Sequence, residues 1–241
     1  MTDPSRADDP HVEPADILRE YGPFPGADHI AGVTHDGTHV WFAAGDKLHA
    51  LDPASGQLVR ALDAACDAGT AFDGTHLYQL TKDRIHKIDP ATGTVIAAIP
   101  APSNSGNSGL AWADGCLWVG QYHTRRIYQI VPETGAILRT IESNRFVTGV
   151  TWVDGELWHG TREDGASDVR RIDPASGTVL ARLELPTGVE VSGLESDGAD
   201  VLYAGGGKSG KVRAILRPRP GEANLPSATV HRGRLSRRTA P

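Results

Sequence analysis

The sequence predicts an all-β fold, a five-bladed β-propeller of four-stranded antiparallel blades, from two turn signals and one aromatic position that recur together. An Asp-Gly pair occurs five times at a spacing of roughly 40 residues, which is the repeat length of a propeller blade. A Pro-x-x-Gly turn follows each of the first four pairs, and a weaker version follows the fifth. Short β-rich runs lie between these turns, so each repeat is predicted to form one antiparallel sheet.

The Asp-Gly pairs mark the hairpin between the first and second strands of each repeat. Aspartate followed by glycine suits a two-residue hairpin turn, which requires positive φ angles. In the Pro-x-x-Gly turns, proline presets one backbone dihedral and glycine supplies a positive φ, so these turns are expected to join the third and fourth strands. The five pairs begin at Asp36, Asp73, Asp114, Asp154 and Asp197.

The second strand of each repeat has an aromatic residue at one matching position. The alternation of apolar and polar residues in these strands predicts that the aromatic side chains fill the space between neighbouring blades, where two sheets pack face to face. They are therefore assigned to the core and not to a ligand site. The five residues are Trp41, Tyr78, Trp118, Trp158 and Tyr203.

The ring of blades is predicted to close through an N-terminal strand, because closure leaves no hydrophobic face or strand edge bare. Residues 15–20 resemble residues 135–140, the predicted fourth strand of the third repeat. We therefore expect residues 16–21 to supply the outer strand of the last blade. The propeller is expected to span residues 15–218, between a flexible N-terminus at residues 1–14 and a basic C-terminal tail at residues 219–241.

The composition argues against nucleic-acid and membrane partners. Lys and Arg number 24 against 30 Asp and Glu, a net charge of -6 that would repel phosphate backbones. No stretch approaches the roughly 18 apolar residues of a membrane helix, and residues 1–16 have no secretory signal pattern. We expect a cytoplasmic protein. Its two cysteines, Cys66 and Cys116, occupy different places in the repeat, so we expect no disulfide between them.

The candidate functional site lies on the face opposite the repeated turns. There the loops between second and third strands, and the segments leading into each first strand, differ from repeat to repeat, and variable loops on a rigid scaffold are where sites are usually built. The polar residues in these segments are the candidates. Predicted acid/base residues are His123, His159 and Glu190, and predicted substrate-binding residues are Asp67, Asn107, Gln121 and Arg162.

Histidines on this face could also bind a metal ion. A neutral imidazole can transfer a proton near neutral pH or coordinate a metal, and His29, His123 and His159 form a candidate ligand set for one divalent ion. The alternative is that they are hydrogen-bonded structural histidines. No local metal-binding motif such as HExxH or CxxC occurs, so the prediction depends on convergence of these side chains in the folded chain.

Two stretches, residues 72–81 with the continuing residues 88–90, and residues 120–135, resemble the plant and bacterial glutamine cyclotransferases. The resemblance extends over roughly residues 29–216 and shares its repeat style with streptogramin lyases and YVTN-type propellers. It implies that the chain folds as a five-bladed propeller. It also implies an enzyme that cyclises an N-terminal glutaminyl residue to pyroglutamate and releases ammonia, with a glutamate near a central channel as the acid/base residue. This chain lacks the corresponding glutamates, since the aligned segments are residues 41–45, WFAAG, and residues 67–69, DAG. Asp67, Glu190 or Glu195 are the carboxylates that could replace them.

Two functions from different classes follow from these observations. The first is an enzyme that acts on a small polar or amide-bearing molecule by acid/base chemistry, with or without a metal ion, at the channel mouth. The second is a non-catalytic propeller that binds a small ligand or a protein on the same face. A third hypothesis, a purely structural module, predicts no pocket at the channel mouth.

Overall fold

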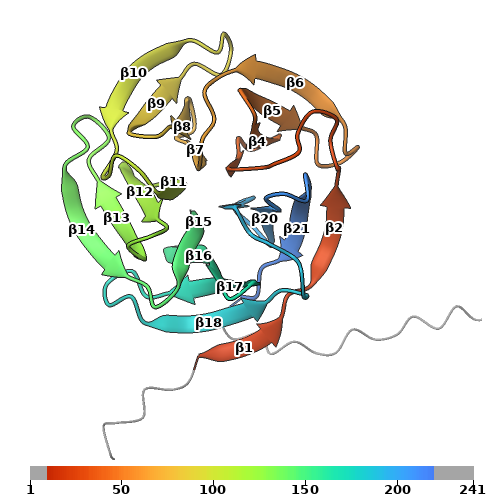
Figure 1. Ribbon diagram of the computed structural model, residues 1–241, viewed down its shortest axis with the longest axis vertical. Helices are drawn as coiled ribbons and strands as arrows, with labels where there is room; N and C mark the ends of the chain where they lie inside the picture. The colour runs from red at the N-terminus through yellow and green to blue at the C-terminus, as the bar shows by residue number, and fades with distance from the viewer. Residues whose placement is uncertain (1–9, 220–241) are drawn as a thin grey trace, which may run out of the picture.

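The computed structural model of the protein describes residues 10–219, and its strands form five sheets arranged as a ring around a central axis (Figure 1). Each blade begins with its innermost strand and ends at the rim. Blade 1 consists of β3 (Val33–His35), β4 (Val40–Ala44), β5 (Lys47–Leu51) and β6 (Leu58–Asp63). Blade 2 consists of β7 (Thr70–Phe72), β8 (Leu77–Leu80), β9 (Arg84–Ile88) and β10 (Val95–Pro100). Blade 3 consists of β11 (Asn107–Ala113), β12 (Cys116–Gln121), β13 (Arg126–Ile130) and β14 (Ile137–Glu142). The predicted five-bladed propeller is confirmed.

The last two blades show how the ring closes. Blade 4 contains β15 (Phe146–Val153), β16 (Glu156–Glu163), β17 (Ala166–Ile172) and β18 (Val179–Glu184), and blade 5 contains β19 (Gly193–Ser196), β20 (Val201–Gly205), β21 (Val212–Leu216) and β2 (Ile17–Tyr21). The N-terminal β2 pairs antiparallel with the C-terminal β21, so that the two ends of the propeller lie side by side in Figure 1. The predicted closure by residues 16–21 is confirmed.

Blade 4 also has a fifth strand that the sequence analysis missed. Strand β1 (His11–Pro14) pairs parallel with β18, and the Ala15 amide extends the ladder by donating to the Glu184 carbonyl at 2.8 Å. These residues fall within the N-terminus expected to be flexible. The physical reason for the difference is that the outer edge of β18 offers backbone groups that a neighbouring extended segment can pair with. Residues 1–9, and residues 220–241 of the predicted basic tail, lie outside the described residues.

The apolar core consists of five clusters, one between each pair of consecutive blades. Trp41 of blade 1 packs with Leu77 of blade 2, and Trp158 of blade 4 packs with Leu202 of blade 5. Each cluster contains one of the five matching aromatic residues, and all five are buried. The core role predicted for these aromatic residues is therefore confirmed. The blades are held to one another by the same sheet-to-sheet packing five times over.

The Asp-Gly turns have two forms. In blades 3 and 4 they are the predicted two-residue hairpins, with positive φ at Asp114 and Asp154 as well as at the following glycines. In blades 1, 2 and 5 the prediction of a two-residue hairpin is wrong, because the loop is longer and the aspartate precedes the tight turn. The Asp36 carboxylate there accepts backbone amides and the Trp41 indole N–H at 2.6 Å, and Asp73 accepts the Tyr78 hydroxyl at 3.0 Å. These aspartates anchor the polar ends of core aromatic residues.

A ring of glycines brings the five innermost strands close together around the axis. A β-carbon placed on Gly149 would lie 2.5 Å from the Leu194 backbone nitrogen, and one on Gly193 would lie 2.6 Å from that of Val33. Such separations are far inside van der Waals contact, so only glycine permits this backbone approach. The ring consists of Gly32, Gly69, Gly109, Gly149 and Gly193.

Replacing Gly149 by alanine should lower the free energy of unfolding by about 2 kcal/mol, because the added methyl group must push blades 4 and 5 apart. Urea denaturation measures this change through the transition midpoint. The control is Gly155→Asn, at a turn with φ 77° where nothing lies within 4 Å of the β-carbon position and asparagine tolerates the left-handed region. Equal stabilities of the two variants would contradict the proposed crowding at the ring.

Candidate functional site

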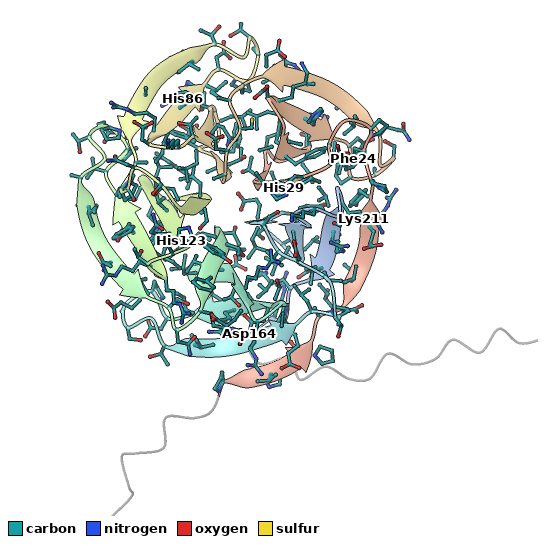
Figure 2. The ribbon with its side chains drawn as sticks, in the orientation of Figure 1. Phe24, His29, His86, His123, Asp164 and Lys211 are labelled. Atoms are coloured by element: carbon teal, nitrogen blue, oxygen red, sulfur yellow. The ribbon has the colours of Figure 1, made fainter. Side chains whose placement is uncertain are left out.

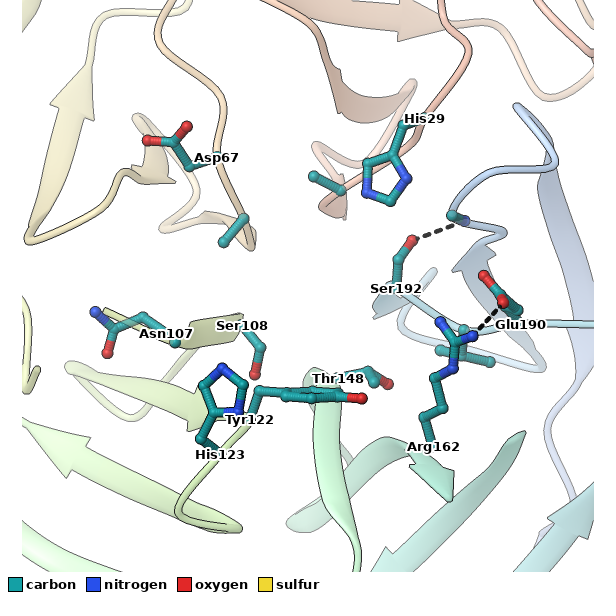
Figure 3. A pocket seen from close by; sticks show the side chains of 15 residues that line it. His29, Asp67, Asn107, Ser108, Tyr122, His123, Thr148, Arg162, Glu190 and Ser192 are labelled. Atoms are coloured by element: carbon teal, nitrogen blue, oxygen red, sulfur yellow. Dashed lines mark hydrogen bonds and ion pairs between the residues drawn. The ribbon is translucent and has the colours of Figure 1, made fainter. Parts of the chain in front are cut away.

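A cavity of about 320 Å³ lies at the mouth of the axis, on the face predicted to hold the site (Figure 3). Its inner wall is formed by the residue that precedes each ring glycine in the five blades. These residues are small, so they leave the mouth open. They are Ala31, Ala68, Ser108, Thr148 and Ser192.

Six of the eight candidate site residues line this cavity, and they reach it from all five blades or the segments between them. Figure 3 shows the imidazoles of His29 and His123 on opposite sides of the cavity, and Figure 2 shows His29 near the axis and His86 further out in blade 2. Neither His29 nor His123 has a hydrogen-bond partner within residues 10–219. The six lining residues are His29, Asp67, Asn107, His123, Arg162 and Glu190.

Two of the predicted residues form an ion pair at the cavity rim. Arg162, near the end of β16, places Nη2 at 2.8 Å from Oε1 of Glu190, which lies in the segment leading to β19. Both side chains are partly exposed, so solvent screens the pair and its contribution to stability is small. Its consequence for the site is geometric, since each side chain limits the orientations of the other. Glu190 was predicted as an acid/base residue, and in this structure its carboxylate has a cationic partner.

Two carboxamides beside the cavity have fixed orientations and buried, unpaired oxygens. Asn107 donates through Nδ2 to the carbonyls of Ser103 at 2.6 Å and Lys82 at 3.2 Å, and Gln121 donates through Nε2 to the Ser105 carbonyl at 2.7 Å. In the described part of the chain, Asn107 Oδ1 and Gln121 Oε1 have no hydrogen-bond donor. A buried acceptor without a donor is costly, so Asn107 at the cavity wall offers a place for a ligand N–H.

Gln121 does not line the cavity, although it was predicted to bind substrate. It is buried behind the loop that contains Gly106, where a β-carbon would lie 2.8 Å from Gln121 Oε1 and 2.9 Å from the His123 ring. Gly106 has a φ of 75°, and its lack of a side chain lets both groups approach this loop. Gln121 thus supports the loop beneath His123 and is separated from the cavity by it.

The cavity continues outward between blades 2 and 3. A second cavity of about 300 Å³ shares Asp67, Ala68, Gly106 and Asn107 with the first and extends to Lys82. The two together form an elongated space with one end at the axis. Its shape suits a ligand longer than one amino acid.

Tyr122 is a cavity residue that the sequence analysis missed. Its ring stacks on Phe146 with centroids 4.7 Å apart, and the Arg125 guanidinium lies 4.4 Å from the Phe146 centroid. The ring also meets His123 edge to face at 5.2 Å. The available signal was an aromatic residue directly before His123 in a loop that breaks the repeat. Ser108, Thr148 and Ser192 precede the recurring glycines and were expected there as small residues that keep the channel mouth open, but not as binding residues.

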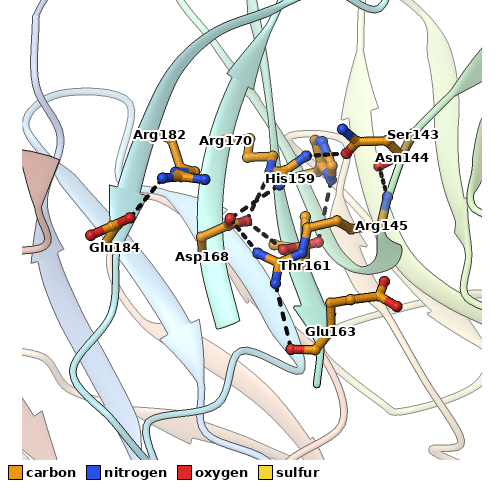
Figure 4. A network of polar contacts seen from close by, with 11 residues as sticks. Ser143, Asn144, Arg145, His159, Thr161, Glu163, Asp168, Arg170, Arg182 and Glu184 are labelled. Carbon is orange, nitrogen blue, oxygen red and sulfur yellow. Dashed lines mark hydrogen bonds and ion pairs between the residues drawn. The ribbon is translucent and has the colours of Figure 1, made fainter. Parts of the chain in front are cut away.

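His159, predicted both as an acid/base residue and as a metal ligand, lies away from the cavity inside blade 4 (Figure 4). It is 1% exposed, and its Nδ1 lies 3.3 Å from the Gly160 carbonyl. Burial, with a smaller effect from the Arg170 charge, lowers the pKa of His159 to about 4. Nearby Asp168 is buried between cations, accepting from Arg145 at 2.7 Å and Arg170 at 2.9 Å. This arrangement matches the structural alternative considered for the histidine.

The three histidines predicted to bind a divalent ion therefore do not converge. His29 and His123 face the cavity, and His159 is enclosed in blade 4. Among residues 10–219, no group of three or more His, Cys, Asp or Glu side chains is arranged to hold a metal ion. Cys66 and Cys116 are both free, and burial raises the pKa of the Cys66 thiol to about 12, so that it stays protonated.

Lowering the pH from 6.5 to 5 should cost the folded state about 2 kcal/mol at His159. The folded pKa of about 4 lies below the ordinary value of 6.5, so the unfolded chain binds more protons in this range and stability falls with pH. His159→Phe, which fills the site without titrating, should lack this loss. Chemical denaturation of both proteins at pH 5 and 6.5 measures it, and an unchanged pH slope in the variant would contradict the assignment.

No family model matches the chain, and no curated protein matches its sequence. Among solved structures it is similar to the glutaminyl cyclase of Myxococcus xanthus, with a TM-score of 0.71 and 18% identity over 86% of this chain and 97% of that chain. It is also similar to virginiamycin B lyase from Staphylococcus aureus, with a TM-score of 0.48 and 16% identity over 83% of this chain and 70% of that chain. The WD40 propeller domain of Doa1 is similar with a TM-score of 0.50 and 18% identity over 78% of this chain and 63% of that chain. The chain has the fold of the glutaminyl cyclase.

At 18% identity the likeness to the cyclase concerns the fold, over nearly the whole length of that protein. The likeness to the cyclase predicted from the repeats therefore holds at the level of architecture. The part of the chain that the structure describes contains no helix that is long and apolar enough to cross a membrane.

Glu195, one carboxylate considered as a substitute for the cyclotransferase glutamate, lies on β19 outside the cavity lining. It follows Ser192 by three residues on the innermost strand, so it sits deeper along the axis than the cavity wall. Its carboxyl accepts hydrogen bonds from the Thr34 hydroxyl at 2.8 Å, the Ser196 amide at 2.9 Å and the Thr151 hydroxyl. Burial raises the pKa of Glu195 to about 7, against the lowering effect of these bonds. It links the innermost strands of blades 4, 5 and 1.

Proposed function

We propose that this protein is a cyclotransferase-like enzyme that acts by proton transfer on a small amide-bearing molecule in the axial cavity. The candidate substrate is a peptide with an N-terminal glutaminyl residue. The observation on which the proposal rests is the cavity itself, which is lined by the unpartnered imidazole of His123, by Asn107 with its unpaired oxygen and by the carboxylate of Asp67.

The acceptors at the border of blades 2 and 3 suit a ligand amine. Asn107 presents a buried Oδ1 with no donor, because its Nδ2 is already bonded to two loop carbonyls. Asp67 adds a negative charge on the same side of the cavity. An amine would fill the acceptor, the Asp67 charge would favour a cationic ligand, and the outer cavity that reaches Lys82 would take the rest of a peptide.

The reaction requires one proton to move between two nitrogens. The substrate α-amine nitrogen bonds to the side-chain amide carbon, and the bond from that carbon to the amide nitrogen breaks. The amine loses a proton and the departing nitrogen gains one, so the products are a pyroglutamyl peptide and ammonia. His123 would accept the first proton and return it to the leaving nitrogen, which is general base and general acid catalysis by one imidazole.

The likeness to the Myxococcus xanthus glutaminyl cyclase supports this class of reaction, since the two chains share an architecture and the name of that protein states its chemistry. Glu190 would hold Arg162 in place through their ion pair. A divalent ion at His29 and His123 stays a prediction, and elemental analysis of the purified protein tests it.

The test is incubation of the full chain with a short peptide that begins with glutamine. Ammonia release and a pyroglutamyl product detected by mass spectrometry, above the rate in buffer alone, would support the proposal. The matched control peptide has its α-amine acetylated, which removes the nucleophile. Absence of any acceleration by the protein over a broad pH range would refute it.

The second candidate function is a propeller that binds an amine or peptide without catalysis. Two observations favour it: segments 41–45 and 67–69 contain no glutamate, and within residues 10–219 the carboxylates that line the main cavity are Asp67 and the ion-paired Glu190. Saturable binding of the glutamine peptide, with no ammonia released, would select this function.

A further inference from the structure

We infer that one wall of the axial cavity is a binding subsite for a carbonyl oxygen of the ligand, formed by Tyr122, Thr148 and Arg162. In Figure 3 the two hydroxyls and the guanidinium lie along the same wall, contributed by blades 3 and 4. The identity of the oxygen, as that of an amide or lactam, rests on the proposed function. The existence of the subsite rests on the groups themselves.

Thr148 has a buried hydroxyl that lacks the partner its counterparts have. Ser108 and Ser192, at the matching positions before their ring glycines, donate to the carbonyls of Val147 and Ile30 in the next blade. Thr148 is 6% exposed and lines the cavity, yet its Oγ1 has no partner in the described chain. A buried polar atom without a partner usually has a ligand or water to satisfy it.

The neighbouring backbone leaves room for this hydroxyl. A β-carbon on Gly160 would lie 2.7 Å from Thr148 Oγ1, so a larger residue in β16 would displace it. The hydroxyl thus occupies a position that glycine keeps free. No group of the described chain accepts it, and rotation about the Cα–Cβ bond of Thr148 would turn it toward the cavity that this residue lines.

Tyr122 supplies a second hydroxyl on a well-supported ring. The phenol oxygen makes no hydrogen bond within residues 10–219, although the ring is stacked on Phe146 at 4.7 Å. Arg125 supports that stack from Phe146 and is itself held by Glu163 at 3.1 Å and by the Asn144 carbonyl at 2.9 Å. A donor on a rigid support is pre-organised, since its orientation costs nothing further when ligand binds.

Arg162 determines which ligand group suits the wall. A guanidinium has only donors, and Glu190 occupies Nη2, leaving other N–H groups free toward the cavity. Two hydroxyls and these N–H groups together favour an acceptor oxygen. Because Glu190 neutralises the arginine, the wall suits a neutral carbonyl that becomes more negative during reaction better than a carboxylate that is already charged.

The placement of acceptors and donors then matches the two ends of the proposed reaction. Asn107 and Asp67 would hold the amine, and Tyr122 and Thr148 would hold the oxygen of the attacked amide. Figure 3 shows His123 between Asn107 and the Tyr122 hydroxyl, so an imidazole that transfers a proton lies between the two proposed binding groups.

The test uses the neutral lactam 2-pyrrolidinone as the probe, with binding to the full chain measured by ligand-observed NMR. Thr148→Val and Tyr122→Phe should each weaken 2-pyrrolidinone about fivefold, the effect of one neutral hydrogen bond. Thr148→Ser, which keeps the hydroxyl, should restore most of the affinity. Thr38→Val, an exposed threonine in the turn between β3 and β4, should change nothing.

The subsite is overturned if wild-type protein does not bind 2-pyrrolidinone, or if the valine and phenylalanine variants, shown to be folded by their unfolding midpoints, bind the lactam like wild type. These outcomes are separate from failure of the proposed function. A protein that releases no ammonia but binds the lactam through Thr148 and Tyr122 retains the subsite and loses only the reaction. A protein that cyclises the peptide equally well in both variants retains the reaction and loses the subsite.

Discussion

Replacing His123 by asparagine should lower the rate of ammonia release from a glutamine-initiated peptide by about 10²- to 10⁴-fold, the usual contribution of a general acid/base. The imidazole lies in the cavity between the acceptors near Asn107 and the donors near Tyr122, and no hydrogen bond to the described chain occupies its ring nitrogens. Asparagine keeps a polar side chain there and removes the titrating group. The measurement is initial rate against pH with a saturating peptide.

The matched control is His86→Asn, because His86 lies on β9 in blade 2 and does not line the cavity. Its rate should equal that of wild type. A wild-type rate in His123→Asn would refute the role of His123. If His29→Asn were inactive and His123→Asn active, the proton transfer would belong to the opposite wall of the cavity.

Replacing Glu195 by glutamine should stabilise the protein at pH 8 by up to about 3 kcal/mol. The folded pKa of about 7 lies above the ordinary value of 4.5, so between these values the folded state binds more protons than the unfolded chain. The free energy of unfolding therefore falls as the pH rises from 4.5 to 7, and the loss is complete above pH 7. A neutral glutamine avoids the cost of burying the carboxylate.

Glutamine can also retain the hydrogen bonds of Glu195. Its carbonyl can accept from Thr151 and the Ser196 amide, as Oε1 does now, and its amide can donate to the Thr34 hydroxyl, which can rotate to accept. The matching positions on the innermost strands of blades 2 and 3 are alanines, Ala71 and Ala111, so no other charge in this layer offsets the carboxylate.

The measurement is chemical denaturation of wild type and Glu195→Gln from pH 4.5 to 8. His159 acts in the opposite direction between pH 4 and 6.5, so the wild-type curve alone is flattened by partial cancellation. The difference between variant and wild type isolates Glu195. It should grow from pH 4.5 to 7 and then level off, and a difference independent of pH would show that the carboxyl is not buried as described.

The candidate site was only partly predictable from sequence. His29, Asp67 and His123 could be placed at the mouth because they break the repeat in segments on one face, and they do line one cavity. Gln121 and His159 satisfied the same criterion and lie elsewhere. Both belong to second strands, whose successive side chains point to opposite faces of the blade and are buried on both, so the sequence does not show which of them reach the cavity.

The sequence by itself determined the number of blades, the places of the turns between strands, the core aromatic residues and the closing strand. These features depend on local dihedral preferences and on a period-two pattern, which neighbouring residues specify directly. The tertiary structure alone decided that β1 adds to blade 4, that Arg162 pairs with Glu190 and that Thr148 and Glu195 differ from their counterparts in the other blades. Each of these contacts joins groups from different blades or from distant segments. The packing of whole sheets against one another brings these groups together, and no local sequence pattern predicts it.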